Sequence, residues 1–234
     1  MKVIILAGGL GTRISEETEN KPKPMVLLDD KPIIWHLMGI YAQQGYSDFV
    51  VATGYKSEVI HDWVDQLNTD WKIEAIDTGL HTQTAGRILQ ITERFDDPQF
   101  MVTYGDGLGN VNLKKLLIHH NKHGRTATVT AVRPPSRFGV IQSQENLVTH
   151  FGEKNQVDSG WINGGFFVLE KGYERYIQSN SESFEANVLP RLVSDKQLTS
   201  FQHEGFWQPM DTLREKTELS IFAKNPNSYW LKDL

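Results

Sequence analysis

The sequence contains no cysteine, which excludes a disulfide framework and any metal site built on thiolates. No stretch approaches the roughly 20 apolar residues that a membrane-spanning helix needs. The first residues lack the charged and long apolar segments of a secretory leader, so we expect a cytoplasmic protein without a membrane partner. The net charge is −5 and both signs are spread along the chain, which argues against nucleic acid as a partner.

What the sequence does contain is an alternation of apolar patterns with the periods of strands and helices. In the first half, strands are expected at residues 3–6, 49–52, 73–76 and 100–104, and helices at residues 33–44, 57–67, 87–94 and 112–122. In the second half, strands are expected at residues 126–132, 139–142, 147–151 and 161–169, and helices at residues 171–178, 184–194 and 212–224, before a surface tail. Alternating strands and helices are typical of βαβ units. The sequence therefore predicts a single α/β domain over residues 1–234: a doubly wound, mostly parallel mixed sheet flanked by helices, with a small antiparallel addition.

The first expected strand leads into the segment LAGGLGTR, which joins three glycines to a threonine and an arginine. Glycine lets the backbone adopt positive φ, and successive N–H groups in such a turn form a concavity that binds anions. Arg13 adds a permanent positive charge that suits phosphate oxygens. A tight turn with a surface arginine is the alternative interpretation. A Walker loop does not fit, and a dinucleotide fingerprint fails because Ile14 stands where its third glycine belongs. Phosphate binding beyond the end of the strand is the favoured hypothesis.

The segment KPKPM follows and carries Lys21 and Lys23 on a stretch that is expected to be extended. Pro22 and Pro24 restrict the backbone on both sides of Lys23, so its ammonium group can be directed at little entropic cost. A solvated loop lysine is the alternative. The neighbouring anion loop favours a role for Lys23 in phosphate binding.

Two aspartates are candidates for a site that binds a hard cation. Mg²⁺ prefers one or two carboxylates together with phosphate oxygens and water. Asp106 stands in YGDG directly after an expected strand, and Asp211 in QPMDT lies far away in the sequence. A simple turn is the alternative for Asp106. For Asp211 the alternative is a helix start, since Thr212 and Glu215 have the spacing of a capping box.

Three of the eight histidines, His119, His120 and His123, lie on or beside one expected helix. Their polar surroundings favour a solvated helix face over a metal site. The sequence shows no nucleophile–base pair that demands a covalent intermediate. Catalysis on a phosphorylated substrate would then depend on positioning and charge neutralisation.

Several motifs together resemble the sugar-phosphate nucleotidyltransferases, namely LAGGLGTR with KPKPMV, DTGLHTQTAGRI, TYGDG, RFGV, INGGFFVL and GFWQPMDTLREK. The last motif is similar to the cytidylyltransferase branch of that family. The resemblance implies a reaction in which CTP and α-D-glucose 1-phosphate give CDP-glucose and pyrophosphate, with Mg²⁺ as cofactor, for dideoxyhexose synthesis and lipopolysaccharide O-antigen. UTP, dTTP or another hexose 1-phosphate as substrate, and a nucleotide-sugar sensor without turnover, are the alternatives.

The resemblance also implies roles for individual residues. The catalytic residues are Arg13, Lys23 and Asp106, and the ligands of Mg²⁺ are Asp106 and Asp211. The nucleotide-binding residues are Leu6, Ala7, Gly8, Gly9, Leu10, Gly11, Thr12, Arg13, Lys23, Thr82, Arg87 and Gly105. The residues that bind the sugar phosphate are Gly139, Glu153, Lys154, Asn163 and Gly165.

Three departures from the family pattern bear on these roles. Ala85 stands where relatives usually have glycine, and Asn155 stands where they usually have proline. The segment between Lys56 and Asp77 is shorter than in typical relatives and lies outside the motif positions. The family implies a homo-oligomer, and the shortening leaves an assembly of a different kind open.

Overall fold

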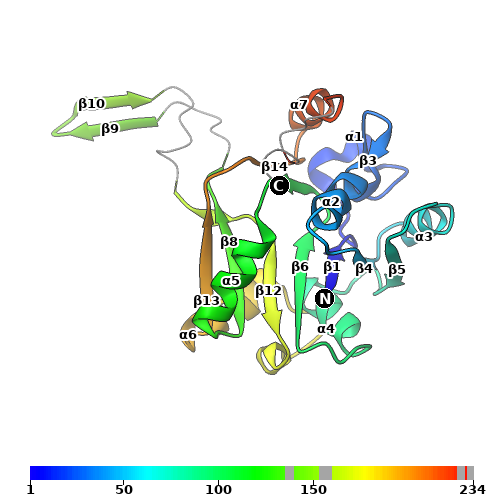
Figure 1. The fold of residues 1–234 in the computed structure, drawn as a ribbon. Coiled ribbons are helices and arrows are strands. Elements are labelled where there is room, and N and C mark those ends of the chain that lie inside the picture. Colours follow the sequence, from blue (N-terminus) through cyan, green and yellow to red (C-terminus); the bar gives the residue numbers. More distant parts are fainter. Residues whose placement is uncertain (135–139, 153–159, 226–229, 231–234) are drawn as a thin grey trace.

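The computed structural model describes residues 1–134, 140–152, 160–225 and residue 230, and its centre is an eight-stranded sheet (Figure 1). Parallel strands in the spatial order β5-β4-β1-β6 form one half of it, with bounds β1 Lys2–Leu6, β4 Asp48–Thr53, β5 Lys72–Asp77 and β6 Gln99–Tyr104. The chain adds strands outward from β1 to β5 and then returns to place β6 on the other side of β1. The order reverses between β1 and β6, which makes this place the switch point of a doubly wound sheet.

The other half of the sheet is mixed. Beyond β6 lie β12 (Phe167–Glu170, antiparallel to β6 and β8), β8 (Ala127–Val132), β11 (Ile162–Asn163, antiparallel to β8) and β13 (Leu198–His203, parallel to β8). The small antiparallel pairs are β2 (Leu27–Leu28) with β3 (Lys31–Pro32), β7 (Gly107–Gly109) with β14 (Trp207–Pro209), and β9 (Val140–Gln144) with β10 (Leu147–Gly152). The predicted fold class, a mostly parallel mixed sheet with antiparallel additions, is confirmed.

Helices cover both faces of the sheet. Successive residues of β1 point to opposite faces, and those after the first are apolar, so both faces need a covering layer. The described α-helices are α1 (Ser15–Thr18), α2 (Ile33–Ala42), α3 (Ser57–Asp65), α4 (Thr84–Thr92), α5 (Leu113–His123), α6 (Leu189–Ser194) and α7 (Leu213–Ala223). Val3 and Ile5 belong to the core under α2, α3 and α5, whereas Ile4 and Leu6 belong to the core under α4 and α6. None of these helices is long and apolar enough to cross a bilayer.

Three elements of the second half differ from the sequence prediction. Only the short 3-10 helix Tyr173–Tyr176 forms where a helix over residues 171–178 is expected, because one turn suffices to bury both tyrosines. The helix expected over residues 184–194 begins with the π-helical turn Phe184–Val188. The strand expected over residues 161–169 is interrupted between β11 and β12, where Gly165 and Phe166 have φ angles of 77° and 46°. No strand continues through this left-handed conformation.

Trp230, which belongs to the tail expected at the surface, is fully buried. Its ring centroid lies 5.5 Å from that of His36 and 6.1 Å from that of Phe206. The surface prediction is therefore wrong for this residue, because burial of a large aromatic ring outweighs the polar character of the residues around it in the sequence.

The histidines of α5 have different environments. His120 is 1% exposed, and its ring nitrogens lie 2.8 Å from Thr128 Oγ1 and 2.9 Å from Glu170 Oε1. His123 is exposed and its ring packs on that of His119. The predicted solvated face is thus wrong for His120 and confirmed for His123. Within the described residues, no group of three or more histidine, aspartate or glutamate side chains is arranged to hold a metal ion.

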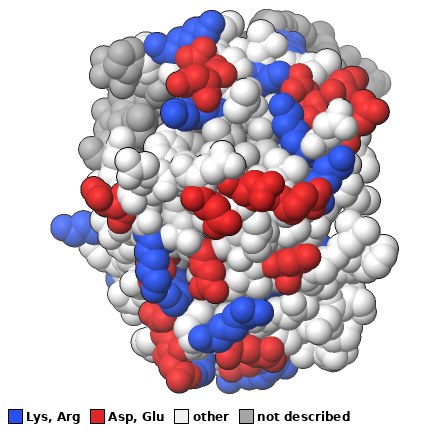
Figure 2. Space-filling view, turned by 90° about the vertical axis from the view of Figure 1, so that its right-hand side faces the viewer, with Lys and Arg blue, Asp and Glu red and all other residues white. Residues whose placement is uncertain are grey.

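Strand β5 forms one edge of the large sheet. Lys72, Glu74 and Asp77 on this strand are exposed. Figure 2 shows the molecule from the side of β5 and α3, where acidic side chains are spread across the surface among basic ones.

Candidate active site

The candidate site lies at the switch point of the sheet, where the chain leaves β1 and β6. Residues 7–13 follow β1, and Gly105 and Asp106 follow β6. The Gly105 N–H donates to the Leu6 carbonyl at 3.0 Å, and a Cβ at Gly105 would lie 2.9 Å from Pro24. Gly105 therefore packs directly against the end of β1 and against Pro24, with no room for a side chain.

The loop after β1 presents backbone donors without partners. Gly11 has a φ of 67° and precedes the short 3-10 helix Thr12–Ile14. Thr18 supports the loop through a hydrogen bond from its Oγ1 to the Gly11 carbonyl at 3.1 Å. Among the residues that the structure describes, no acceptor faces the N–H groups of residues 9–12. Clustered free donors of this kind can bind the oxygens of a phosphate.

Arg87 lies beneath this loop and holds it in place. It is 4% exposed, and its guanidinium donates to the carbonyls of Gly8 at 3.1 Å and Thr53 at 2.7 Å, and to the Thr78 hydroxyl. These bonds connect the ends of β1, β4 and β5. The resemblance implies that Arg87 contacts the nucleotide; the geometry shows that it also fixes the loop after β1 against two neighbouring strands.

We expect Gly54→Ala to lower the free energy of unfolding by about 1–3 kcal/mol, the usual cost of overpacking a filled site. A Cβ at Gly54 would lie 2.5 Å from Arg87 Nη1, and the guanidinium cannot move away without losing its hydrogen bonds. Urea denaturation measures the change. Gly39→Ala is the matched control, because a Cβ at this position in α2 meets nothing within 4 Å. The control should stabilise the protein by about 0.5–1 kcal/mol. Equal effects of the two substitutions would show that Arg87 is not held rigidly.

Four charged side chains meet at the open side of the loop. Lys23 Nζ lies 2.7 Å from Asp106 Oδ2 and 2.6 Å from Asp211 Oδ1. Arg13 Nη1 lies 2.9 Å from Asp211 Oδ2. The Lys23 side chain is 9% exposed and that of Arg13 is 75% exposed, so Lys23 is fixed whereas Arg13 is accessible to a ligand. Two cations and two carboxylates thus form a compact, charge-balanced cluster.

The backbone around Lys23 differs from the extended segment that the sequence predicts. Pro22 is extended, but Lys23–Met25 form a 3-10 helix, since proline fits the first turn of a helix. Burial favours the neutral amine, but the two carboxylates together outweigh it and raise the pKa of Lys23. Burial likewise favours neutral Asp211, but Lys23 and Arg13 outweigh it and lower the pKa of Asp211. Both groups are therefore charged at neutral pH.

Asp211 reaches the cluster from the second half of the chain through a small sheet. β14 pairs with β7, so that Pro209 lies opposite Gly107. The Met210 N–H then donates to the Asp106 carbonyl at 2.9 Å. This pairing places the two aspartates side by side although more than a hundred residues separate them in the sequence.

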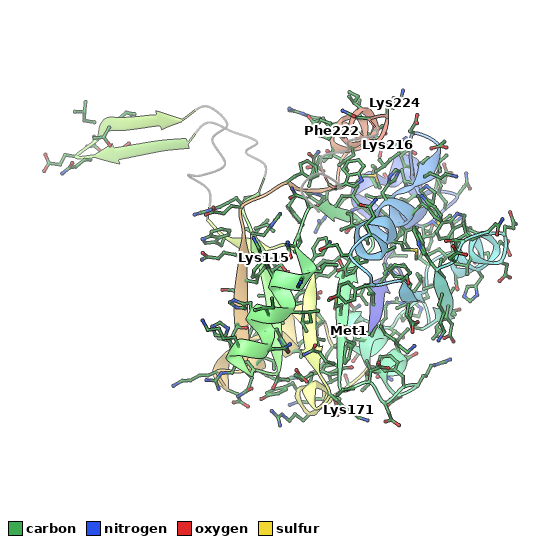
Figure 3. All side chains as sticks on the ribbon, viewed as in Figure 1. Met1, Lys115, Lys171, Lys216, Phe222 and Lys224 are labelled. Carbon is green, nitrogen blue, oxygen red and sulfur yellow. The ribbon has the colours of Figure 1, made fainter. Side chains whose placement is uncertain are left out.

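The start of α7 holds Asp211 in position. Thr212 Oγ1 accepts from the Glu215 N–H at 3.2 Å, and Glu215 Oε2 accepts from the Asp211 N–H at 2.7 Å. The predicted cap at Thr212 is therefore confirmed, whereas Glu215 binds the N–H one residue before the cap, and both bonds coexist with the place of Asp211 in the cluster. Lys216 extends from α7 (Figure 3) and pairs with Glu17 on α1, which ties the helix to the region just after Arg13.

These groups line one cleft of about 610 Å³. The predicted nucleotide and metal residues that line it are residues 6–13, Lys23, Thr82, Arg87, Gly105, Asp106 and Asp211. Other lining residues were not predicted, among them Leu80, His81, Gln83, Thr84 and Tyr104. They lie within the motifs DTGLHTQTAGRI and TYGDG, but no role was predicted for them from the sequence.

The structure brings together only part of the set predicted for the sugar phosphate. Gly139, Glu153 and Lys154 lie outside the described residues. Asn163 Nδ2 donates to the Tyr104 hydroxyl at 2.9 Å, and Asn163 Oδ1 accepts from the Gly165 N–H at 2.9 Å. Asn163 and Gly165 do not line the cleft themselves, but both adjoin Tyr104, which does.

A doubly wound sheet that carries free loop donors, a fixed lysine and two carboxylates at its switch point is typical of enzymes that act on nucleotide phosphates. The chain matches the family of nucleotidyl transferases over residues 2–230. It is 40% identical to glucose-1-phosphate cytidylyltransferase of Salmonella typhi, over 98% of each chain, and 38% identical to a probable glucose-1-phosphate cytidylyltransferase of Bacillus subtilis, over 98% of this chain and 99% of the relative. A crystal structure of HddC from Yersinia pseudotuberculosis complexed with GMP-PN has a TM-score of 0.77 at 25% identity and covers 95% of this chain and 99% of that one. The chain therefore belongs to the nucleotidyl transferase family.

Proposed function

We propose that the protein transfers the cytidylyl group of CTP to α-D-glucose 1-phosphate, giving CDP-glucose and pyrophosphate. Relatives that bear the name of this activity support the choice of substrates, and the alignments cover nearly their whole length. The observation that carries the proposal is Lys23, held between Asp106 and Asp211 beside the free N–H groups of the loop after β1. A fixed cation among carboxylates at a phosphate-binding loop serves phosphoryl transfer rather than binding alone.

The chemistry requires positioning rather than proton transfer. A phosphate oxygen of the sugar phosphate attacks the α-phosphorus of CTP, the bond to the bridging oxygen of the β-phosphate breaks, and pyrophosphate leaves in line. The attacking phosphate is already an anion at neutral pH, so no general base is needed. The barrier comes from the approach of two anionic phosphates. Loop N–H groups, Arg13 and Lys23 offset this repulsion, while Thr82, Arg87 and Gly105 form the nucleotide side of the cleft.

Asp106 and Asp211 fit a Mg²⁺ ion. Both carboxylates lie within hydrogen-bonding distance of Lys23 Nζ in the cleft, so they are close enough to share one ion, and phosphate oxygens and water would fill its other positions, as this ion prefers. When bound, the ion would neutralise charge on the triphosphate and on the leaving pyrophosphate. Lys23 would orient both carboxylates toward it.

The remaining parts of the proposal concern the sugar-binding residues, the domain organisation, the oligomeric state and the cellular location. Asn163 and Gly165 are proposed to bind the sugar phosphate together with Gly139, Glu153 and Lys154. We further propose a single domain over residues 1–234, a homo-oligomer and a cytoplasmic location. The alignment to the Salmonella relative spans 253 residues, more than the 234 of this chain, so the assembly must form without residues that this relative has.

A panel of four nucleoside triphosphates against several hexose 1-phosphates, read by pyrophosphate release with Mg²⁺, tests the proposal. We expect kcat/KM for CTP with glucose 1-phosphate to exceed that of every other pair at least tenfold, because a site that hydrogen-bonds one base leaves polar groups unpaired with another. A preference for UTP or dTTP would leave the proposed reaction type in place and replace CTP as the nucleotide substrate. A preference for GTP with mannose 1-phosphate would fit the mannose-1-phosphate guanyltransferase of Schizosaccharomyces pombe, which is 33% identical. Tight nucleotide binding without release from any pair would contradict the proposal and favour a sensor.

A further inference from the structure

A relay of hydrogen-bonded side chains joins the start of α4 to the end of β11. Glu185, on the π-helical turn Phe184–Val188, is its centre. Its Oε2 accepts from the Thr84 hydroxyl at 2.7 Å, and its Oε1 accepts from the Tyr104 hydroxyl at 2.7 Å. The Tyr104 oxygen accepts in turn from Asn163 Nδ2 at 2.9 Å. One carboxylate thus connects a wall of the cleft to a residue proposed to bind the sugar.

The chemistry of the groups fixes the direction of every bond in the relay. A carboxylate accepts hydrogen bonds, so the Tyr104 O–H group donates a hydrogen bond to Glu185 at 2.7 Å, and the Tyr104 oxygen accepts one from Asn163 at 2.9 Å. Asn163 is also held at its other end, by the Gly165 N–H at 2.9 Å. The amide is therefore held in one of its two orientations.

The oriented amide matches a sugar hydroxyl. Of the two N–H bonds of Asn163, one is used by Tyr104, and of the two lone pairs of Oδ1, one is used by Gly165. One donor and one acceptor remain on this exposed residue. A hydroxyl group both accepts and donates, so a hexose can pair with both.

The hydrogen-bond partners of Glu185 differ from those of a carboxylate whose role is to stabilise the fold. Its partners among the described residues are hydroxyls, those of Thr84, Tyr104 and Ser183. Neutral donors compensate poorly for removing a carboxylate from water. Glu182, three residues earlier, shows the structural case: both of its oxygens bind the Arg191 guanidinium, which lowers the pKa of Glu182 to about 2.

We propose that Glu185, acting through Tyr104, is a positioning residue that orients Asn163 toward the hydroxyls of the hexose 1-phosphate. The inference rests on the proposed function, because it assumes that a sugar phosphate occupies the border of the cleft. It adds to that function two residues for which the sequence predicted no role, Glu185 and Tyr104.

The test compares Glu185→Gln, Tyr104→Phe and the double variant by steady-state kinetics. Glutamine keeps the shape of Glu185, but its NH₂ group must donate to one of the hydroxyls and reverses a bond of the relay. We expect each single variant to raise KM for glucose 1-phosphate about tenfold, the effect of one lost hydrogen bond, with KM for CTP changed less than twofold. Because both substitutions interrupt the same relay, the double variant should be no worse than either single one.

Glu182→Gln is the matched control, since it removes a neighbouring acid that touches neither Tyr104 nor Asn163. It should lower thermal stability and leave both KM values unchanged. An unchanged KM for glucose 1-phosphate in Tyr104→Phe, or effects that add in the double variant, would overturn the proposal. Should Glu185→Gln not fold, the contrast between Tyr104→Phe and the control decides alone.

A second measurement separates this proposal from the proposed function. In ¹⁵N-labelled protein, the side-chain amide signal of Asn163 is identified by its loss in Asn163→Asp. The signal should shift in Glu185→Gln and Tyr104→Phe and stay in place in Glu182→Gln. If the wild-type protein turns over no substrate pair, the proposed function and the sugar role fail together, whereas the shift still reports the relay. If turnover is normal and the signal does not move, the relay fails and the function stands.

Discussion

Replacing Lys23 with methionine is expected to lower kcat/KM about a thousandfold, while the protein still folds. Methionine retains the length and apolar stem of lysine but removes the only charge that lies within 3 Å of both Asp106 and Asp211 in the described part of the chain. Removal of one preorganised donor to a developing charge commonly costs a hundredfold to a thousandfold in rate. Here the loss also leaves two carboxylates facing each other. Pyrophosphate release with CTP and glucose 1-phosphate measures the effect.

The stability of this variant is part of the prediction. Breaking a fully buried ion pair costs about 3–5 kcal/mol. The Asp106 side chain is 31% exposed, so water can solvate its free carboxylate, and we expect a loss of about 2 kcal/mol, read by urea denaturation. Lys21→Met is the matched control, because Lys21 is the same residue type two positions away and has no place in the cluster. It should change neither activity nor stability appreciably. A Lys23→Met variant with more than a tenth of the wild-type activity would contradict the assignment.

Asp106→Asn and Asp211→Asn are each expected to reduce kcat/KM about a hundredfold to a thousandfold and to raise the Mg²⁺ concentration needed for half-maximal rate. Asparagine keeps the size of aspartate but removes the charge that a hard cation requires. Loss of one carboxylate also leaves Lys23 with a single anionic partner. Titration of the rate with Mg²⁺ at saturating CTP separates a weakened metal site from a general loss of structure.

Asp62→Asn provides the control for these two variants. Asp62 is exposed on α3, away from the cleft, and its substitution should leave the Mg²⁺ titration unchanged. If either site variant kept its metal requirement and most of its rate, the proposed pair of ligands would be wrong. If only one of the two variants needed more Mg²⁺, the aspartate changed in the other variant would hold Lys23 in place rather than bind the metal.

The parts of the molecule that sequence could predict depend on local patterns. The apolar run of β1 cannot be solvated, so burial on both faces follows from composition alone. The loop after β1 and the turn at Asp106 were predictable from their glycines, namely Gly8, Gly9, Gly11 and Gly105. Glycine next to a charged residue at the end of a buried strand favours a tight turn in which the backbone can approach a ligand. Parallel strands place their carboxyl ends at one edge, which brings these two loops together without knowledge of any side chain.

The parts that sequence missed depend on partners far away in the chain. The resemblance assigns Arg87 to the nucleotide, but its role in fixing the loop after β1 is visible only once the carbonyls of Gly8 and Thr53 are seen around it. Glu185 carries no motif, and its role depends on Tyr104 from another strand. Trp230 looks like part of a surface tail because polar residues are frequent in the last ten positions of the sequence. In each case the free energy comes from contacts that no local pattern encodes, so only the folded structure reveals them.

Strand β5 leaves a row of backbone N–H and C=O groups open at the end of the sheet. Such an edge can recruit a strand from another copy of the chain and start aggregation. Lys72, Glu74 and Asp77 place charges of both signs along this edge, so an added strand would have to remove them from water. The edge therefore resists disordered self-association at high protein concentration, and any ordered assembly is expected to use another surface.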